Sequence, residues 1–114
     1  MHRLAEQTCE ACRVDAPRLS REQIEELLAD VPKWQYIENE DAPRLRRVFE
    51  VKDFAEALTL TNRIGEIAEA EQHHPVIVTE YGEVTVLWWT HKIQGLHKND
   101  FIMAAKTDQA AEEG

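Results

Sequence analysis

The sequence predicts an α+β domain, in which a four-stranded antiparallel sheet carries three helices in the order α-β-β-α-β-β-α. Three segments place apolar residues at spacings of three and four, which is typical of amphipathic helices. Between them lie two pairs of short strand-like runs, each pair joined by a turn-rich stretch, which is typical of β-hairpins. Hairpins imply antiparallel pairing, and helices packed on such a sheet define the α+β class.

Capping residues and breakers mark the ends of the predicted helices. Ser20 is a suitable N-cap, and Gln23 three residues later completes a capping box. Asp53 and Glu56 have the same spacing at the second helix. Pro32 ends the first apolar pattern. The helices are expected at about residues 20–30, 53–71 and 99–111.

The strands are predicted from alternation and from β-branched runs. They are expected around residues 34–37 and 45–51 and, after Pro75, at 76–78 and 84–90. Gly82-Glu83 is a plausible two-residue turn of the second hairpin, which would place His74 opposite His91. The run 84–90 is apolar on both faces, so it is expected to be a central strand.

The second helix has more apolar surface than one buried stripe needs. The expected stripe consists of Phe54, Ala57, Leu58, Thr61, Ile64, Ile67 and Ala68, and the residues that widen it include Leu60 and Ala70. Such an excess indicates a second buried face, which a helix-to-helix contact between subunits would supply. We therefore expect a homodimer or a dimer of dimers.

Length and charge narrow the class of protein. The chain of 114 residues is expected to form one domain over residues 19–111, after a polar leader at 1–18. Its formal charge of −9 disfavours direct binding of nucleic acid. No apolar run approaches the ~20 residues that cross a bilayer, and no signal peptide is evident. These features predict a cytoplasmic domain that binds neither membranes nor nucleic acid.

Cys9 and Cys12 form a C-x-x-C pair in the leader. Such a pair can be a redox dithiol or half of a zinc site. The strand-helix context of the redox motif and a second C-x-x-C are both missing. We expect reduced thiols that are dispensable for catalysis.

Histidines are the residues most indicative of chemistry. His73, His74 and His91 gather around the second hairpin, and Glu69 precedes His73 by one helical turn. Such a cluster suits general acid/base catalysis near neutral pH, or a three-histidine zinc site with one open position. Adjacent histidines diverge along a strand, which weakens the zinc alternative. H-E-x-x-H, G-x-S-x-G and phosphate-binding glycine loops are absent.

The stretch 69–101 resembles the pterin-4a-carbinolamine dehydratases. The matching motifs are an acidic residue, H-H-P, T-H, G-L and an aspartate that opens the last helix; here they are Glu69, His73-His74-Pro75, Thr90-His91, Gly95-Leu96 and Asp100. Trp34 and the K-D-F at 52–54 also match, so the resemblance covers about residues 20–108. The leader with its C-E-A-C is similar to bacterial members.

The resemblance implies dehydration of 4a-hydroxytetrahydropterin to quinonoid dihydropterin, which recycles the pterin cofactor of aromatic amino acid hydroxylases without a metal or other cofactor. It implies that His73, His74 and His91 are catalytic and that Glu69, Trp34 and Asp100 bind the substrate. It also implies dimers or tetramers. Asn99 stands where some members have an arginine, and His97 where others have a Ser or Thr cap. For Trp34, a plain core position is nearly as good an interpretation.

Two alternatives differ in class from a metal-free dehydratase. One is a dimerisation cofactor or coactivator module, because vertebrate relatives also act in that way. The other is a histidine-ligated zinc protein, in which Cys9 and Cys12 would also take part.

Overall fold

The computed structural model describes residues 20–38, 43–90, 96 and 98–113. Within these residues, three helices and one four-stranded antiparallel sheet follow the predicted order, which confirms the fold class. The elements are α1 (Arg21–Leu28), β1 (Gln35–Ile37), β2 (Arg44–Glu50), α2 (Phe54–Glu71), β3 (Val76–Glu80), β4 (Glu83–Trp88) and α3 (Lys98–Glu113). No helix in the described residues combines the length and apolar character needed to cross a bilayer.

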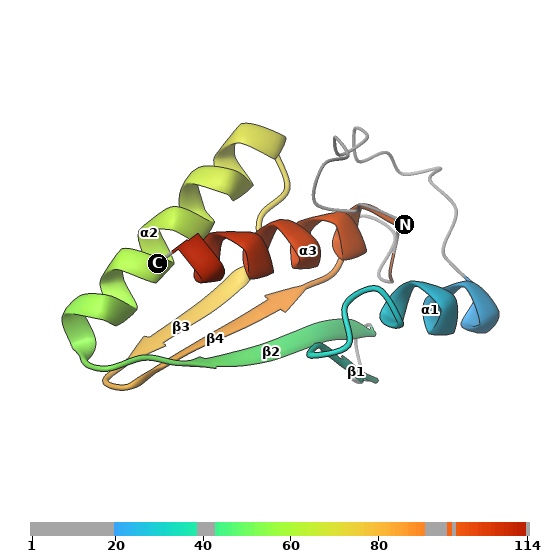
Figure 1. Cartoon of the computed structure of the whole chain (residues 1–114). Coiled ribbons are helices and arrows are strands. Elements are labelled where there is room, and N and C mark those ends of the chain that lie inside the picture. Colours follow the sequence, from blue (N-terminus) through green and yellow to red (C-terminus); the bar gives the residue numbers. More distant parts are fainter. Residues whose placement is uncertain (1–19, 39–42, 91–95, 97, 114) are drawn as a thin grey trace.

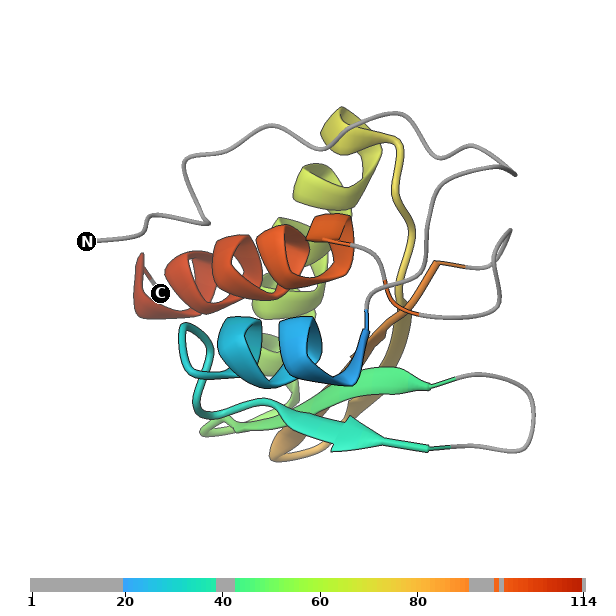
Figure 2. The ribbon, with the colours of Figure 1, turned by 90° about the vertical axis from the view of Figure 1, so that its right-hand side faces the viewer.

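The sheet has the strand order β1-β2-β4-β3, and every neighbouring pair is antiparallel. Strand β4 is therefore central, as expected from its apolar character. All three helices lie on the same face of the sheet (Figure 1). Helix α3 lies between α1 and α2 and contacts both of them (Figure 2). The core lies between this helical layer and the sheet.

The core is formed by residues from each of these layers. Strand β4 alternates, so that Val84, Val86 and Trp88 are fully buried toward the helices while Thr85 and Leu87 are only partly buried. Other fully buried large side chains include Leu45, Ile64, Leu96, Phe101 and Met103. Helix α3 is thereby anchored on the middle of the sheet.

The predicted caps are present at α1 and α2. The hydroxyl of Ser20 accepts from the backbone N–H of Gln23, and the Gln23 side chain accepts from the backbone of Ser20, which confirms the capping box. Asp53 accepts from the backbone N–H of Glu56. The Glu56 carboxylate accepts from the backbone of Lys52, one residue before the N-cap.

The predicted register of the second hairpin was wrong by two residues. The turn is formed by Tyr81 and Gly82, so that Glu80 pairs with Glu83 and the expected opposition of His74 and His91 does not follow. Gly82 adopts a φ of 84°, which a glycine reaches without steric cost. A shift of two residues leaves every side chain on its predicted face, so the apolar pattern could not detect it.

The buried face of α2 also differs from the expected stripe. Ala57, Leu60 and Ile64 are buried, whereas Phe54 and Leu58 are 45% and 44% exposed. Leu60 therefore belongs to the core and not to the additional apolar surface expected on this helix. That additional surface is present, but it consists of the exposed Phe54 and Leu58.

Candidate active site

A buried carboxylate in the first turn of α3 connects two other parts of the chain. Asp100 is fully buried. One of its oxygens lies 2.7 Å from Nε2 of His73, and the other accepts a hydrogen bond of 2.8 Å from the hydroxyl of Thr90. A carboxylate only accepts hydrogen bonds, so the His73 ring carries its proton on Nε2. The start of a helix favours a negative charge at this position.

The end of α2 directs His73 into the interior. Gln72 adopts the left-handed conformation, with φ 56° and ψ 38°. The backbone N–H of His73 then donates to the carbonyl of Ala68, five residues earlier, at 3.1 Å, which is the wider-spanning of the two hydrogen bonds of a Schellman motif. This turn reverses the chain sharply, so the residue after it enters the core.

The His73 ring is held on its face as well as at its edge. Its imidazole lies nearly parallel to the indole of Trp88, with an angle of 7° between the planes and 5.6 Å between the ring centres. His73 is only 4% exposed, and Trp88 is fully buried. Three segments thus position this imidazole: the turn after α2, strand β4 and helix α3.

His74 faces the opposite environment, as expected for adjacent histidines that diverge. Its Nε2 lies 2.8 Å from a carboxylate oxygen of Glu69, and the two side chains are 58% and 74% exposed. The residues diverge in the extended segment before β3 rather than within the strand. The result is a buried imidazole paired with Asp100 beside an accessible imidazole paired with Glu69.

Trp34 lies at the other end of α3. Its indole N–H donates to Asp108 at 2.8 Å, and its ring packs edge-on against Phe49. Asp108 follows Asp100 by eight residues, which is roughly 12 Å along a helix. The structure therefore pairs His73 with Asp100 and the neighbouring His74 with Glu69, but it places Trp34 in a separate cluster. Its burial, at 4% exposure, agrees with the core alternative.

The cluster around Trp34 contains a carboxyl group that the sequence did not single out. Asp108 also accepts a hydrogen bond from Arg47 and forms an ion pair with it. The Arg47 guanidinium lies over the Phe49 ring. Burial raises the pKa of Asp108 above its ordinary value of 3.8 and outweighs the lowering effect of the Trp34 and Arg47 contacts. In the sequence, Asp108 is one acidic residue among several on an amphipathic helix, so no pattern marked it.

Several predicted positions lie outside the described residues, namely His91, His97, Cys9 and Cys12. Among the described residues, no group of three or more His, Cys, Asp or Glu side chains could hold a metal ion. Because the third histidine and both cysteines fall outside that set, the zinc alternative is untested. Asn99 is described, and it is 1% exposed in the first turn of α3.

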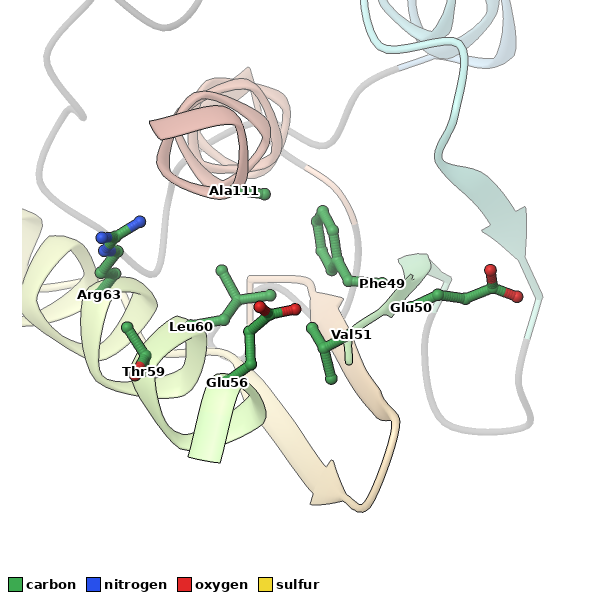
Figure 3. A pocket seen from close by; sticks show the side chains of 8 residues that line it. All are labelled: Phe49, Glu50, Val51, Glu56, Thr59, Leu60, Arg63 and Ala111. Carbon is green, nitrogen blue, oxygen red and sulfur yellow. The ribbon is translucent and has the colours of Figure 1, made fainter. Parts of the chain in front are cut away.

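A cavity of about 160 Å³ lies away from these histidines, between α2, the end of β2 and α3 (Figure 3). It is lined by Phe49, Glu50, Val51, Glu56, Thr59, Leu60, Arg63 and Ala111. None of the predicted site residues lines it. Its volume is below the range of about 300–1,000 Å³ that is typical of small-molecule sites. We therefore place the candidate site at His73, not here.

A carboxylate-bound imidazole beside an accessible one offers groups that are suited to general acid/base catalysis. The family model for pterin 4 alpha carbinolamine dehydratase matches residues 17–110, so the chain belongs to this family of hydro-lyases. A protein of Nitrosococcus oceani with the provisional name pterin-4-alpha-carbinolamine dehydratase is 60% identical, over 96% of each chain. One of Syntrophotalea carbinolica with the same provisional name is 56% identical, over 98% of this chain and all of its own.

A solved structure adds to the comparison. The crystal structure of a transcriptional coactivator/pterin dehydratase from Brucella melitensis matches with a TM-score of 0.76 and 29% identity. The match covers 83% of this chain and 99% of that one. The predicted family is thereby confirmed by sequence and by fold.

Proposed function

We propose that this protein dehydrates pterin-4a-carbinolamine to quinonoid dihydropterin by histidine acid/base catalysis that needs no metal. The observation that carries the proposal is the fully buried Asp100 bound to His73. Burying a carboxylate costs several kcal/mol unless it is well paired. A structural role alone would be served as well by an apolar residue, whereas a hydrogen-bond acceptor such as this carboxylate orients an imidazole.

The reaction needs an acid and a base on the substrate. An imidazolium donates its proton to the 4a-hydroxyl, and the C4a–O bond breaks to release water. A neutral imidazole accepts the proton from N5, and the electron pair of that N–H bond forms the N5=C4a double bond. Imidazoles supply both forms near neutral pH.

The roles of the residues follow from their environments. His74 is the described imidazole that a solute reaches directly, and Glu69 beside it would bind the pterin ring. His73 and the predicted third histidine, His91, would complete the acid/base set. Asp100 holds the proton of His73 on Nε2 and so acts through that ring.

Assembly and partners form part of the same proposal. The exposed Phe54 and Leu58 on α2 would be buried between subunits of a homodimer or tetramer. An aromatic amino acid hydroxylase would supply the substrate, and the cytoplasmic location stays a prediction. A coactivator function is favoured only by the description of the Brucella melitensis structure.

The direct test is the decay of 4a-hydroxytetrahydropterin, generated in situ, with and without the purified protein. We expect catalytic amounts to accelerate the decay, with the same rate after exhaustive treatment with a chelator. A protein that leaves the decay unchanged would contradict the dehydratase proposal. A rate that is abolished by chelation and restored by zinc would contradict the metal-free mechanism.

A further inference from the structure

One face of α3 makes two polar contacts with strand β4 and the residues just after it. The first is the Asp100 contact with Thr90, at the start of the helix. The second is two turns further on, where Thr107 accepts a hydrogen bond of 3.1 Å from the indole N–H of Trp88. The Thr107 hydroxyl in turn donates to the carbonyl of Met103 at 2.7 Å. Thr107 and Trp88 are both fully buried.

The Thr107 contact determines how the Trp88 indole is oriented. A buried indole N–H needs an acceptor, because without one it loses its hydrogen bond to water and gains none in return. Thr107 is held in turn by its own hydrogen bond to Met103, so the acceptor has a defined position. The plane of the indole is therefore fixed by α3 rather than by apolar packing alone.

The indole is also the surface on which the His73 ring rests, nearly parallel to it. The hydrogen bond at Nε2 holds one edge of the imidazole. A flat partner on one face limits how far the ring can tilt. An aromatic face also attracts the ring when it is positively charged. Asp100 and Trp88 thus restrain the same imidazole in two different directions.

We propose that Trp88, oriented by Thr107, is a positioning residue for His73 in the dehydration reaction. The proposal rests on the proposed function of His73 as an acid/base group. Trp88 and Thr107 are buried and act through the His73 ring. Their loss should therefore slow the chemical step without weakening substrate binding.

The first test compares three variants with the wild-type protein. Thr107→Val keeps the side-chain volume and removes the acceptor, and Trp88→Phe keeps an aromatic face and removes the N–H. We expect kcat to fall about threefold to tenfold in both, with KM within about twofold, because catalysis depends steeply on the placement of the reacting groups. Thr107→Ser restores the hydroxyl and should return kcat to within about twofold of wild type.

Thr61→Val provides the matched control. It also removes a hydroxyl, a partly buried one that hydrogen-bonds to Thr79 at 2.8 Å between α2 and β3, away from Trp88. We expect this variant to keep the wild-type kcat. An equal loss of kcat in Thr61→Val and Thr107→Val would overturn the proposal, because the effect would then be a general consequence of lost stability.

The second test does not depend on activity. The ring current of a stacked indole shifts the carbon-bound protons of the His73 imidazole upfield, and their NMR signals are identified by their loss in His73→Asn. We expect Thr107→Val to move these signals and Thr107→Ser to restore them. Folded Thr107→Val and Trp88→Phe proteins with unchanged signals and kcat would refute the proposal. If the wild-type protein shows no dehydratase activity, the proposed function fails while the NMR result still decides whether Trp88 orients the ring.

Discussion

Replacing Asp100 by asparagine tests the centre of the proposed site. The substitution keeps the shape of the side chain and removes its charge. An asparagine can still accept from His73 through its carbonyl oxygen and donate to the hydroxyl oxygen of Thr90. The variant therefore separates the effect of the charge from the effect of filling the site.

The size of the effect follows from the two hydrogen bonds of Asp100, at 2.7 and 2.8 Å. Hydrogen bonds to a charged group contribute about 1.5–3 kcal/mol, against about 0.5–1.5 kcal/mol for neutral ones. Losing the charge should thus lower the free energy of unfolding by at most about 2 kcal/mol, since an amide also costs less to bury. The loss in rate should be about 10- to 100-fold, which corresponds to about 1.4–2.7 kcal/mol of transition-state stabilisation.

The assay measures initial rates of dehydration together with thermal unfolding followed by circular dichroism. Asp108→Asn is the matched control, since it makes the same change on the same helix about 12 Å away, and its rate should stay at the wild-type level. An Asp100→Asn protein that is folded and as active as wild type would refute the assignment of Asp100 to the site. A rate loss shared equally by Asp108→Asn would do the same.

Three further predictions concern the catalytic groups, a carboxyl group outside the site, and assembly. His73→Ala and His91→Ala should each lower the dehydration rate by about 100-fold or less, the effect of losing one acid/base group; full activity in both folded variants would contradict the assignment. Burial raises the pKa of Asp108 in the folded protein. The proton that Asp108 binds therefore stabilises the fold fully below pH 3.8, the ordinary pKa, and this stabilisation is lost as the pH rises through the pKa of the folded state. Denaturant unfolding from neutral pH to about pH 3.5 should therefore show that the wild-type protein gains stability relative to Asp108→Asn as the pH falls. A difference in the free energy of unfolding that stays constant with pH would exclude a raised pKa for Asp108. Light scattering should give a multiple of the 13.2 kDa chain, and Phe54→Glu with Leu58→Glu should reduce it toward one chain; a wild-type protein at 13.2 kDa would contradict the proposed contact.

Local signals in the sequence were sufficient to predict the elements and their order. The cap of α1 depends on two polar residues three positions apart, Ser20 and Gln23, and both hydrogen bonds form as expected. Central placement of β4 followed from its apolar character. The divergence of His73 and His74 was predicted because neighbouring residues in an extended segment point to opposite sides. Each of these properties is set by residues close together in the chain.

Other features depend on contacts that no local pattern encodes. The hairpin register depends on which residue takes the turn position with positive φ, and an even shift leaves the apolar alternation intact. On α2, apolar residues surround so much of the helix that periodicity could not separate the buried Leu60 from the exposed Leu58. The Trp88–Thr107 hydrogen bond joins a strand to a helix, and neither residue stands out in its own segment.

The strand order has a consequence for the way in which this protein folds. The hairpins β1-β2 and β3-β4 join neighbouring segments, and such hairpins form in about 1–10 μs. Pairing β2 with β4 requires the ends of a much longer loop, containing α2 and β3, to meet, so the entropy of closing that loop makes it the slower step. His73 lies within this loop and Asp100 lies beyond it. During refolding, dehydratase activity should therefore return together with the completed sheet, later than the signals of the separate hairpins.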